Sequence, residues 1–177
     1  MTTEAASTPA AAGFSSKDFR AALGSFATGV TVVTTANPGG HGYGMTVNAF
    51  SSVSLDPPLV LVCAISGQTG SEEIDRNRCF AVNILALDQE PLSGYFASRD
   101  RPRGRDAFRD VDHRIGVSGS PLLDGVVAYL DCALHSSYTV GDHEIFIGEV
   151  LDLHVEPGAE PLLFHGGSYR FLRPKTA

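Results

Sequence analysis

One stretch of the chain carries hydrogen-bonding side chains in a pattern that could hold a ligand. Residues 44–54 read GMTVNAFSSVS and alternate as a β-strand does, so every second side chain points to one side. That side carries Thr46, Asn48, Phe50, Ser52 and Ser54. Uncharged polar groups around one aromatic ring suit a partner that is flat and apolar on its faces and bears heteroatoms along its edge. The alternative is an ordinary edge or barrel strand whose hydroxyl groups face water.

The segment SGQTGS at residues 66–71 places hydroxyl groups beside a predicted helix start. Its candidate binding residues are Ser66, Thr69 and Ser71. Hydroxyls and backbone amides at the start of a helix form a site for an anion such as a phosphate. Ser71, with two glutamates behind it, could also be the N-cap of that helix, and the two roles are compatible.

Two further motifs have both a structural and a functional interpretation. Gly141, Asp142 and His143 join two long β-like runs, which predicts a hairpin turn and leaves open whether the histidine touches a ligand. Residues 99–109 hold five arginines among several aspartates. This segment is either a solvated loop with salt bridges or a local site for an anionic ligand.

Motifs of the familiar catalytic classes are absent. The sequence has no G-x-S-x-G, no H-E-x-x-H, no Walker A, and no G-x-G-x-x-G between a strand and a helix. Cys63, Cys79 and Cys132 lie far apart, and none has a histidine at ligand spacing. We therefore expect free thiols in a reducing compartment and no metal site. This pattern favours a reaction whose reactive atoms belong to a cofactor.

Length and composition fit one globular domain with short tails. The 177 residues are 43% hydrophobic, and no apolar run approaches the roughly 20 residues of a membrane span. The net charge of −7 argues against nucleic acid or an anionic membrane as a general partner. Residues 1–13 lack the basic stretch of a signal peptide, which predicts a flexible tail, and residues 174–177 form a second tail. We expect the protein to be cytoplasmic.

The apolar and turn patterns predict a mainly β fold with few helices. Helices are expected at residues 15–24, within residues 66–78 and at residues 88–98, and strands elsewhere. A long hairpin is expected over residues 126–155. On its second strand the predicted core face carries Ile145, Ile147, Leu151, Leu153 and Val155. Many antiparallel strands joined by glycine turns predict a closed or nearly closed barrel.

The isoalloxazine ring of a flavin meets the demands of residues 44–54. The ring is flat, its faces are apolar, and its edge carries oxygen and nitrogen atoms. Thr46, Asn48 and Ser52, together with backbone amides, could satisfy that edge. The small side chain of Ala49 would let the ring approach closely.

Five segments follow one another along the chain: FRAALGSFATGVTVVTT, GMTVNAFSSVSLDPPLVLVCAI, FAVNIL, GDHEIFIGEV and PLLFHGGSYRFL. In sequence and order they resemble the flavin reductase-like family of FMN-binding split barrels. The likeness covers residues 14–173 and is greatest to the reductase components of two-component flavin monooxygenases. It implies an antiparallel split β-barrel of the FMN-binding type as one domain over residues 14–173.

The resemblance implies which residues bind the flavin. In this family the strand that matches residues 46–52 lies along the flavin. The expected contacts of the ring and ribityl chain are Thr46, Val47, Asn48, Ala49, Ser51 and Ser52. The loop with Ser66, Thr69 and Ser71 is expected to bind the flavin phosphate, although its spacing departs from the Ser-x-Thr pattern of the family.

The resemblance also implies roles for three residues elsewhere. His143 is expected to position the nicotinamide or to act on the charge that develops on the flavin. Tyr169 and Arg170 match a Tyr-Arg pair that lies near the flavin in the family, with core packing as the alternative for Tyr169.

The function that the resemblance implies is NAD(P)H:flavin oxidoreductase activity, with a hydride passing from NADH or NADPH to FMN or FAD. It also implies a homodimer and a partner oxygenase that receives the reduced flavin by diffusion. Two other functions stay open: a module that binds or shuttles flavin without nicotinamide turnover, and a scaffold recruited to another small-molecule redox or biosynthetic reaction. The arginines of residues 99–109 could reach a phosphate of NAD(P)H or the second subunit.

Overall fold

The computed structural model describes residues 13–173, so residues 1–12 and 174–177 of the two predicted tails lie outside the described residues. The helices are α1 (Ser16–Gly24), α2 (Thr69–Asn77), the short 3₁₀ turn η1 (Leu87–Gln89) and α3 (Glu90–Ala97). The first strands are β1 (Thr28–Gly29), β2 (Thr31–Ala36), β3 (Gly42–Val47), β4 (Phe50–Leu55), β5 (Pro58–Ile65) and β6 (Cys79–Ile84). The others are β7 (His113–Ile115), β8 (Pro121–Leu123), β9 (Ala128–Val140), β10 (His143–Val155), β11 (Leu163–His165) and β12 (Ser168–Arg170).

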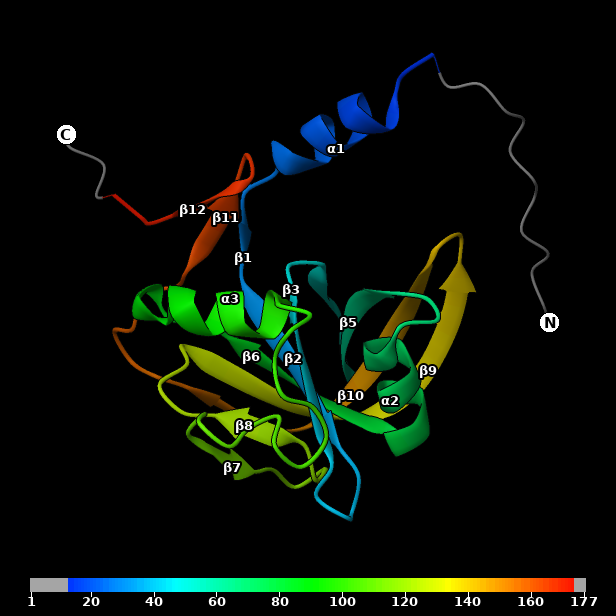
Figure 1. Ribbon diagram of the computed structural model, residues 1–177, viewed down its shortest axis with the longest axis vertical. Coiled ribbons are helices and arrows are strands. Elements are labelled where there is room, and N and C mark those ends of the chain that lie inside the picture. Colours follow the sequence, from blue (N-terminus) through cyan, green and yellow to red (C-terminus); the bar gives the residue numbers. More distant parts are fainter. Residues whose placement is uncertain (1–12, 174–177) are drawn as a thin grey trace.

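The main sheet has seven antiparallel strands in the order β3-β2-β6-β9-β10-β5-β4 (Figure 1). Its two edge strands, β3 and β4, are consecutive in the chain and separated only by Asn48 and Ala49. A link of two residues can join opposite edges only if the sheet curls until those edges meet. Cys63 on β5 donates its backbone N–H to the carbonyl of Ala49 at 3.0 Å, which holds the junction in place. Within residues 13–173 no ladder pairs β3 with β4, and the antiparallel split barrel that the sequence predicted is confirmed.

Two hydrophobic clusters fill the space on either side of the curled sheet. The cluster inside the curl takes buried side chains from β2, β5, β6, β9 and β10, and Ile74 of α2 joins it. The cluster on the outside lies under α3, whose Phe96 is almost fully buried. Because Val32 and Val33 belong to different clusters, β2 is buried on both faces. The central strands therefore form a fixed frame for the edges.

The prediction that residues 44–54 form one strand was wrong. The chain leaves β3 after Val47 and enters β4 at Phe50, on the opposite edge of the sheet. The alternation of the sequence continues across this break, so it could not reveal that barrel closure interrupts the strand. Ser52 and Ser54 consequently do not share a face with Thr46.

The predicted core face of β10 was also wrong over most of its length. The buried residues of this strand are Phe146 and Gly148, which have the opposite parity. A Cβ on Gly148 would lie 2.5 Å from the ring of Phe80, so the interior cluster reaches the strand at this position. Leu153 and Val155 are 58% and 60% exposed. The strand has two apolar faces, and bulges at 147/148 and 150/152 shift its register.

Helix α1 lies where a helix was expected, with Ser15 as its N-cap, and stands away from the barrel (Figure 1). Ser15 and Asp18 form a reciprocal capping box, in which each side chain bonds the other residue's backbone N–H. None of its residues is buried, and Phe19 and Leu23 are exposed. No helix among the described residues is both long and apolar enough to cross a membrane.

Candidate functional site

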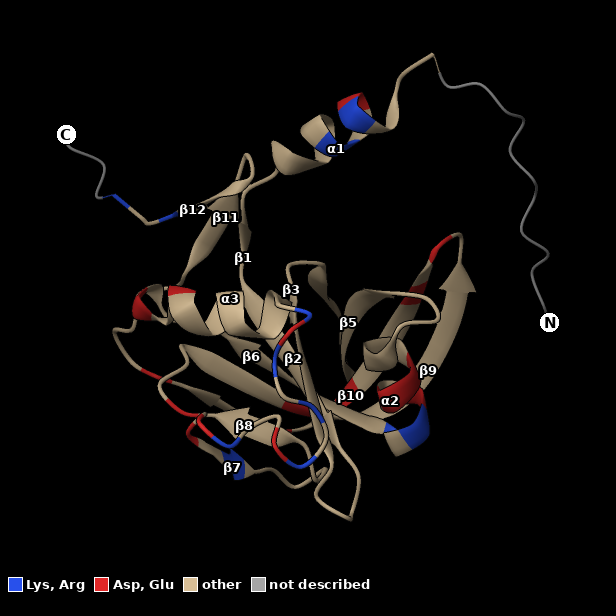
Figure 2. Ribbon diagram, in the orientation of Figure 1, with Lys and Arg blue, Asp and Glu red and all other residues tan. Residues whose placement is uncertain are grey.

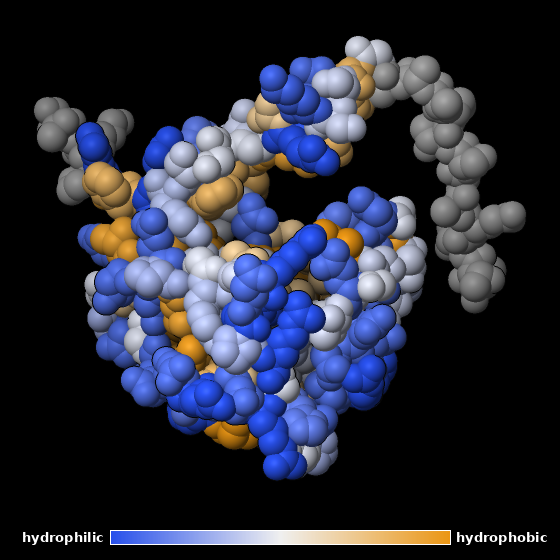
Figure 3. All heavy atoms as spheres, viewed as in Figure 1, coloured by the Kyte–Doolittle hydropathy of each residue, from blue (hydrophilic) through white to orange (hydrophobic). Residues whose placement is uncertain are grey.

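A cavity of about 750 Å³ opens where the two edges of the sheet meet. Its walls are the end of β3 with the β3–β4 junction, the end of β5, the start of α2 and the segment that follows α3. Figure 3 shows hydrophilic side chains down the middle of this face beside a hollow. Cavities of about 300–1,000 Å³ hold most small-molecule ligands and cofactors.

Four of the predicted ring contacts, Thr46, Val47, Asn48 and Ala49, line this cavity. The hydroxyl of Thr46 donates to the carbonyl of Ser93 at 2.7 Å, so its proton is already used inside the protein. The backbone N–H groups of Asn48 and Ala49 donate to no group within residues 13–173. Two backbone amides without a partner, beside the small side chain of Ala49, are suitable donors for the heteroatom edge of a flat ring.

The start of α2 forms the next part of the wall, with Thr69, Gly70 and Ser71. Gly70 allows α2 to pack closely against β3, because a Cβ at this position would lie 2.5 Å from the sulfur of Met45. The N-cap is Gln68, which makes no side-chain capping bond, so the alternative of Ser71 as N-cap was wrong. First-turn amides without a cap lie at the cavity and favour an anion.

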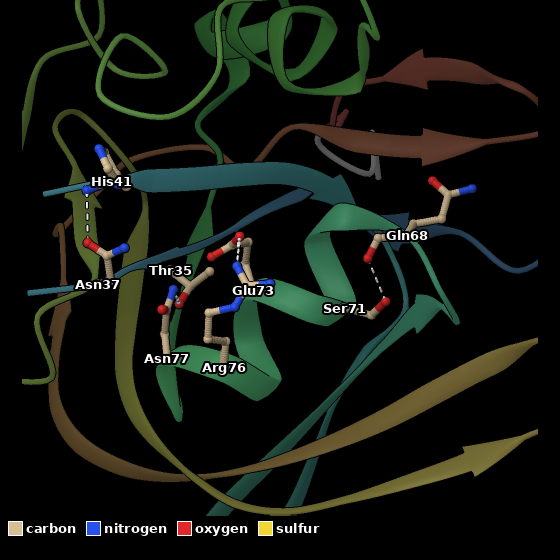
Figure 4. A network of polar contacts seen from close by, with 8 residues as sticks. All are labelled: Thr35, Asn37, His41, Gln68, Ser71, Glu73, Arg76 and Asn77. Carbon is tan, nitrogen blue, oxygen red and sulfur yellow. Dashed lines mark hydrogen bonds and ion pairs between the residues drawn. The ribbon is translucent and has the colours of Figure 1, made fainter. Parts of the chain in front are cut away.

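The three hydroxyls predicted for a phosphate have different surroundings. Ser71 is buried, and its hydroxyl donates to the carbonyl of Gln68 at 2.8 Å (Figure 4) and lies 3.0 Å from the carbonyl of Ile65. Ser66 lies outside the cavity lining and donates to Glu144 at 2.9 Å, which ties its loop to β10. Of the three, Thr69 alone lines the cavity with a hydroxyl that bonds no other residue within residues 13–173.

His143 lines the same cavity from the start of β10. Its Nδ1 lies 2.7 Å from a carboxylate oxygen of Asp142, and this hydrogen bond lowers the pKa of Asp142. The carboxylate fixes the imidazole by one nitrogen and leaves Nε2 for a ligand. Because Asp142 is fully exposed, the pair orients the ring more than it stabilises the fold.

The remaining predicted residues do not line the cavity. Ser51 and Ser52 are exposed on β4, and the hydroxyl of Ser51 donates to the carbonyl of Ser52 at 3.1 Å. The Tyr169 hydroxyl is 2.9 Å from that of Ser93, and its ring packs against the outer cluster. Arg170 is exposed and donates to the carbonyl of Tyr169. Tyr169 therefore reaches the site only through Ser93, whose carbonyl accepts from Thr46.

The residues that sequence reasoning did not assign to the site are chiefly arginines of the loop after α3. Arg99, Arg101 and Arg103 line the cavity, and Figure 2 shows blue segments along this loop. Arg101 donates to the carbonyls of Gly44 and Ser98 and lies over the ring of Tyr43, 5.0 Å from its centroid, so it is part of the wall. The density of arginines was the available signal.

The five arginines of this loop separate into two groups. Arg99 and Arg103 have no carboxylate within ion-pair distance among residues 13–173. Arg109 pairs with Asp106 in an exposed contact, as the salt-bridged interpretation of the loop expected. Arg105 lies outside the cavity and donates to His41 at 3.1 Å. At the cavity described here, an anion can therefore meet only the first three arginines, because Arg105 and Arg109 line a different cavity of about 690 Å³.

Cys63 is the one cysteine in the lining of this cavity, and it is half-buried. Burial raises the pKa of the Cys63 thiol. Burial and the neighbouring Asp131 raise the pKa of Cys132 to about 12. All three cysteines are free, and no group of three metal-ligating side chains occurs among the described residues.

Comparisons with known proteins agree on one family. Residues 23–173 match the model of the flavin reductase like domain. The chain is 43% identical to the FMN reductase (NADH) SmoA of Agrobacterium fabrum over 91% of its length and 89% of that protein. It is 38% identical to the reductase subunit HsaB of a flavin-dependent monooxygenase from Rhodococcus jostii, covering 88% of this chain and 77% of that one.

A solved structure is also similar along nearly the whole chain. It is the NADH:FAD oxidoreductase SgcE6 of Streptomyces globisporus C-1027 in complex with NAD and FAD fragments. The TM-score is 0.83 at 41% sequence identity, and the match covers 91% of this chain and 94% of that one. The described cavity, the split barrel and these matches lead to one conclusion. The chain belongs to the flavin reductase-like family.

Proposed function

We propose that this protein is an NAD(P)H-dependent flavin reductase that supplies reduced FMN or FAD to a partner oxygenase. The observation that carries the proposal is the cavity at the split of the barrel, where two open amides and a helix start line one space. A bound flavin supplies the hydride acceptor at its N5 atom, and NADH or NADPH supplies the hydride. The chain itself contributes alignment, which is the main requirement of such a transfer.

The residues of the cavity divide this task. Asn48 and Ala49 donate their backbone N–H groups to the ring edge, where negative charge develops during reduction. Thr69 and the first amides of α2 hold the flavin phosphate. His143, oriented by Asp142, positions the nicotinamide. Five residues that do not line this cavity would contribute to cofactor binding in one of two ways. They would support the wall from behind, or they would reach the cofactor from the second subunit of a dimer: Ser51, Ser52, Ser66, Tyr169 and Arg170.

The direct test is to mix the purified protein with NADH or NADPH and with FMN or FAD. We expect the absorbance band of the reduced nicotinamide to disappear only when a flavin is present. Retention of yellow flavin without nicotinamide oxidation would instead favour the flavin-binding module. Activity that requires another organic substrate and no oxygenase would favour a recruited scaffold.

The role of His143 has its own test. The change His143→Ala should lower kcat about ten- to hundredfold with a much smaller change in the flavin Kd, because a misplaced nicotinamide slows only the transfer. Asp142→Ala should produce a smaller loss, since it removes the orienting bond and leaves the imidazole. An unchanged kcat in both variants would reduce His143 to a hairpin residue.

The homodimer remains part of the proposal, and exposed apolar surface supports it. Leu153 and Val155 on β10, Leu55 on β4 and Phe19 on the detached α1 are all exposed. An apolar strand face and apolar helix side chains that residues 13–173 leave uncovered are typical of surfaces that a second subunit covers. Leu153→Glu should yield monomers in light scattering, whereas Ile115→Glu, at an exposed apolar residue on β7, should not.

The proposed location is the cytoplasm, where NADH and NADPH are generated, and three free thiols agree with a reducing compartment. Delivery by diffusion requires that reduced flavin leaves the protein. A reductase and a flavin-dependent oxygenase separated by a dialysis membrane that passes flavin should therefore still give oxygenated product under low oxygen. Product formed only on direct mixing would contradict delivery by diffusion.

A further inference from the structure

A small cavity of about 250 Å³ adjoins the main one, and a separate cavity of about 690 Å³ is lined by Arg105 and Arg109. The small cavity and the main one share Tyr43, Thr69 and Arg103 in their linings, so they are contiguous. The volume lies below the roughly 300–1,000 Å³ of complete ligand sites, which makes it a subsite of a longer ligand.

The small cavity continues the main one along a single face of α2. Thr69, Glu73 and Arg76 stand at positions i, i+4 and i+7, and all three line it. The opposite wall is the β2–β3 hairpin with Asn37 and His41. In Figure 4 the side chains of Glu73 and Arg76 lie between α2 and this hairpin.

The positions of the proposed ring and phosphate contacts along the two cavities set the direction in which a flavin nucleotide would lie. A flavin ring at Asn48 and Ala49 with its phosphate at Thr69 reaches the point where the cavities join. FMN ends at that phosphate. FAD continues from that phosphate through a second phosphate to an adenosine, and the adenosine would lie in the small cavity.

The lining of the small cavity has the chemistry that an adenylate group requires. Arg103 is exposed and has no carboxylate partner among residues 13–173. One of its Nη atoms donates to the carbonyl of Arg99 at 3.3 Å, and its remaining N–H donors can bind a phosphate. Two backbone N–H groups, of Gly39 and His41, bond the Asn37 side-chain oxygen at 2.9 and 3.2 Å. This fixes the amide and leaves its NH₂ group free to donate. Glu73, which pairs with Arg76 beside it, has carboxylate oxygens that can accept from ribose hydroxyls.

We infer that the small cavity is the subsite for the adenylate half of FAD and that Arg103 binds the second phosphate. The inference rests on the proposed function and selects between two flavins that the relatives do not separate, since one is named for FMN and another for FAD. The protein then binds FAD more tightly than FMN. Arg103 is a specificity-determining residue and takes no part in hydride transfer.

The test is to measure the Kd of FAD and of FMN by quenching of flavin fluorescence, without nicotinamide, for the wild type and Arg103→Ala. We expect FAD affinity to fall about tenfold, as for loss of one charge-assisted hydrogen bond of roughly 1.4 kcal/mol, and FMN affinity to change less than twofold. Arg109→Ala is the matched control for net charge, because that arginine lies in neither cavity, and it should leave both values unchanged. AMP should compete with FAD and not with FMN.

Several results would overturn the inference. Equal losses for both flavins would place Arg103 at their shared phosphate, and no loss for either would remove it from flavin binding. If Arg103→Ala raised the KM for NADH and left both flavin affinities unchanged, the small cavity would bind part of the nicotinamide dinucleotide instead. Failure of the wild type to oxidise NADH would reject the proposed function, while the flavin affinities would still decide the inference.

Discussion

Strands β2 and β4 differ in burial although both are rich in valine and hydroxyl residues. All six residues of β2, TVVTTA, are buried, and none of the six of β4, FSSVSL, is. In β2 every threonine hydroxyl donates to a backbone carbonyl, as Thr35 does to Cys79 at 2.8 Å. In β4 Ser51 and Ser52 are both exposed. The same residue types therefore stabilise the centre of the sheet and leave its edge open, and the site lies at the edge.

The largest effect is expected in the centre. Phe80→Ala removes a fully buried ring that packs against Gly148 and should lower the free energy of unfolding by about 3–5 kcal/mol. Urea denaturation checks this value. If the loss is below about 1 kcal/mol, the contrast in rigidity between centre and edge does not hold.

A large side chain at the edge should act on binding and not on folding. Ala49 is exposed at the junction and lines the cavity, so Ala49→Phe places a ring where the flavin is proposed to lie. We expect flavin Kd to rise at least tenfold, about 1.4 kcal/mol, with an unchanged urea midpoint. Wild-type affinity in a stable variant would move the ring away from residues 46–49.

Thiol reactivity sharpens the same contrast between edge and centre. Burial raises the pKa of Cys63, so the reactive thiolate is scarcer at pH 8 than in a free thiol and alkylation should speed up as pH rises beyond 9. Bound FMN should slow the reaction, because Cys63 lines the cavity. Cys132, with a pKa of about 12 and a central position, should stay unmodified in the native protein. Mass spectrometry after iodoacetamide treatment reads each site, and equal labelling with and without FMN would contradict the placement of the ring.

The smallest effect is expected on β4. Ser52→Ala removes an exposed hydroxyl outside the cavity lining, so stability should change by less than about 0.5 kcal/mol and flavin Kd by less than twofold. A tenfold weaker flavin affinity would return Ser52 to the binding wall, by way of the second subunit.

Local signals predicted most elements, and long-range closure decided what they missed. The helix at residues 15–24 and the hairpin turn at Gly141 follow from short motifs, and both were predicted. The break after Val47 depends on which strands pair across the sheet, and no nearby residue encodes it. The core side of β10 depends on Phe80 filling the space over Gly148, whereas Leu151, Leu153 and Val155 looked equally suitable.

The candidate site was predicted in the same uneven way. Residues 46–49, Thr69, Ser71 and His143 line the cavity, because adjacency in the chain and a hairpin turn place them there. Arg99, Arg101 and Arg103 were visible as a dense cluster, but which of the five arginines face a ligand depends on how the loop folds. Tyr169 was placed by resemblance alone, and its hydroxyl bonds Ser93 behind the wall.

The two-residue link between β3 and β4 has a consequence for how the protein opens. The backbone of Asn48 and Ala49 joins the two edge strands there, the Cys63–Ala49 bond continues the β4–β5 ladder beside it, and a ligand proposed at Asn48 and Ala49 would lie along that junction. Any motion that separates the edge strands β3 and β4 must widen the ligand cavity at the same time. Opening of the barrel edges and release of the ligand are then the same motion.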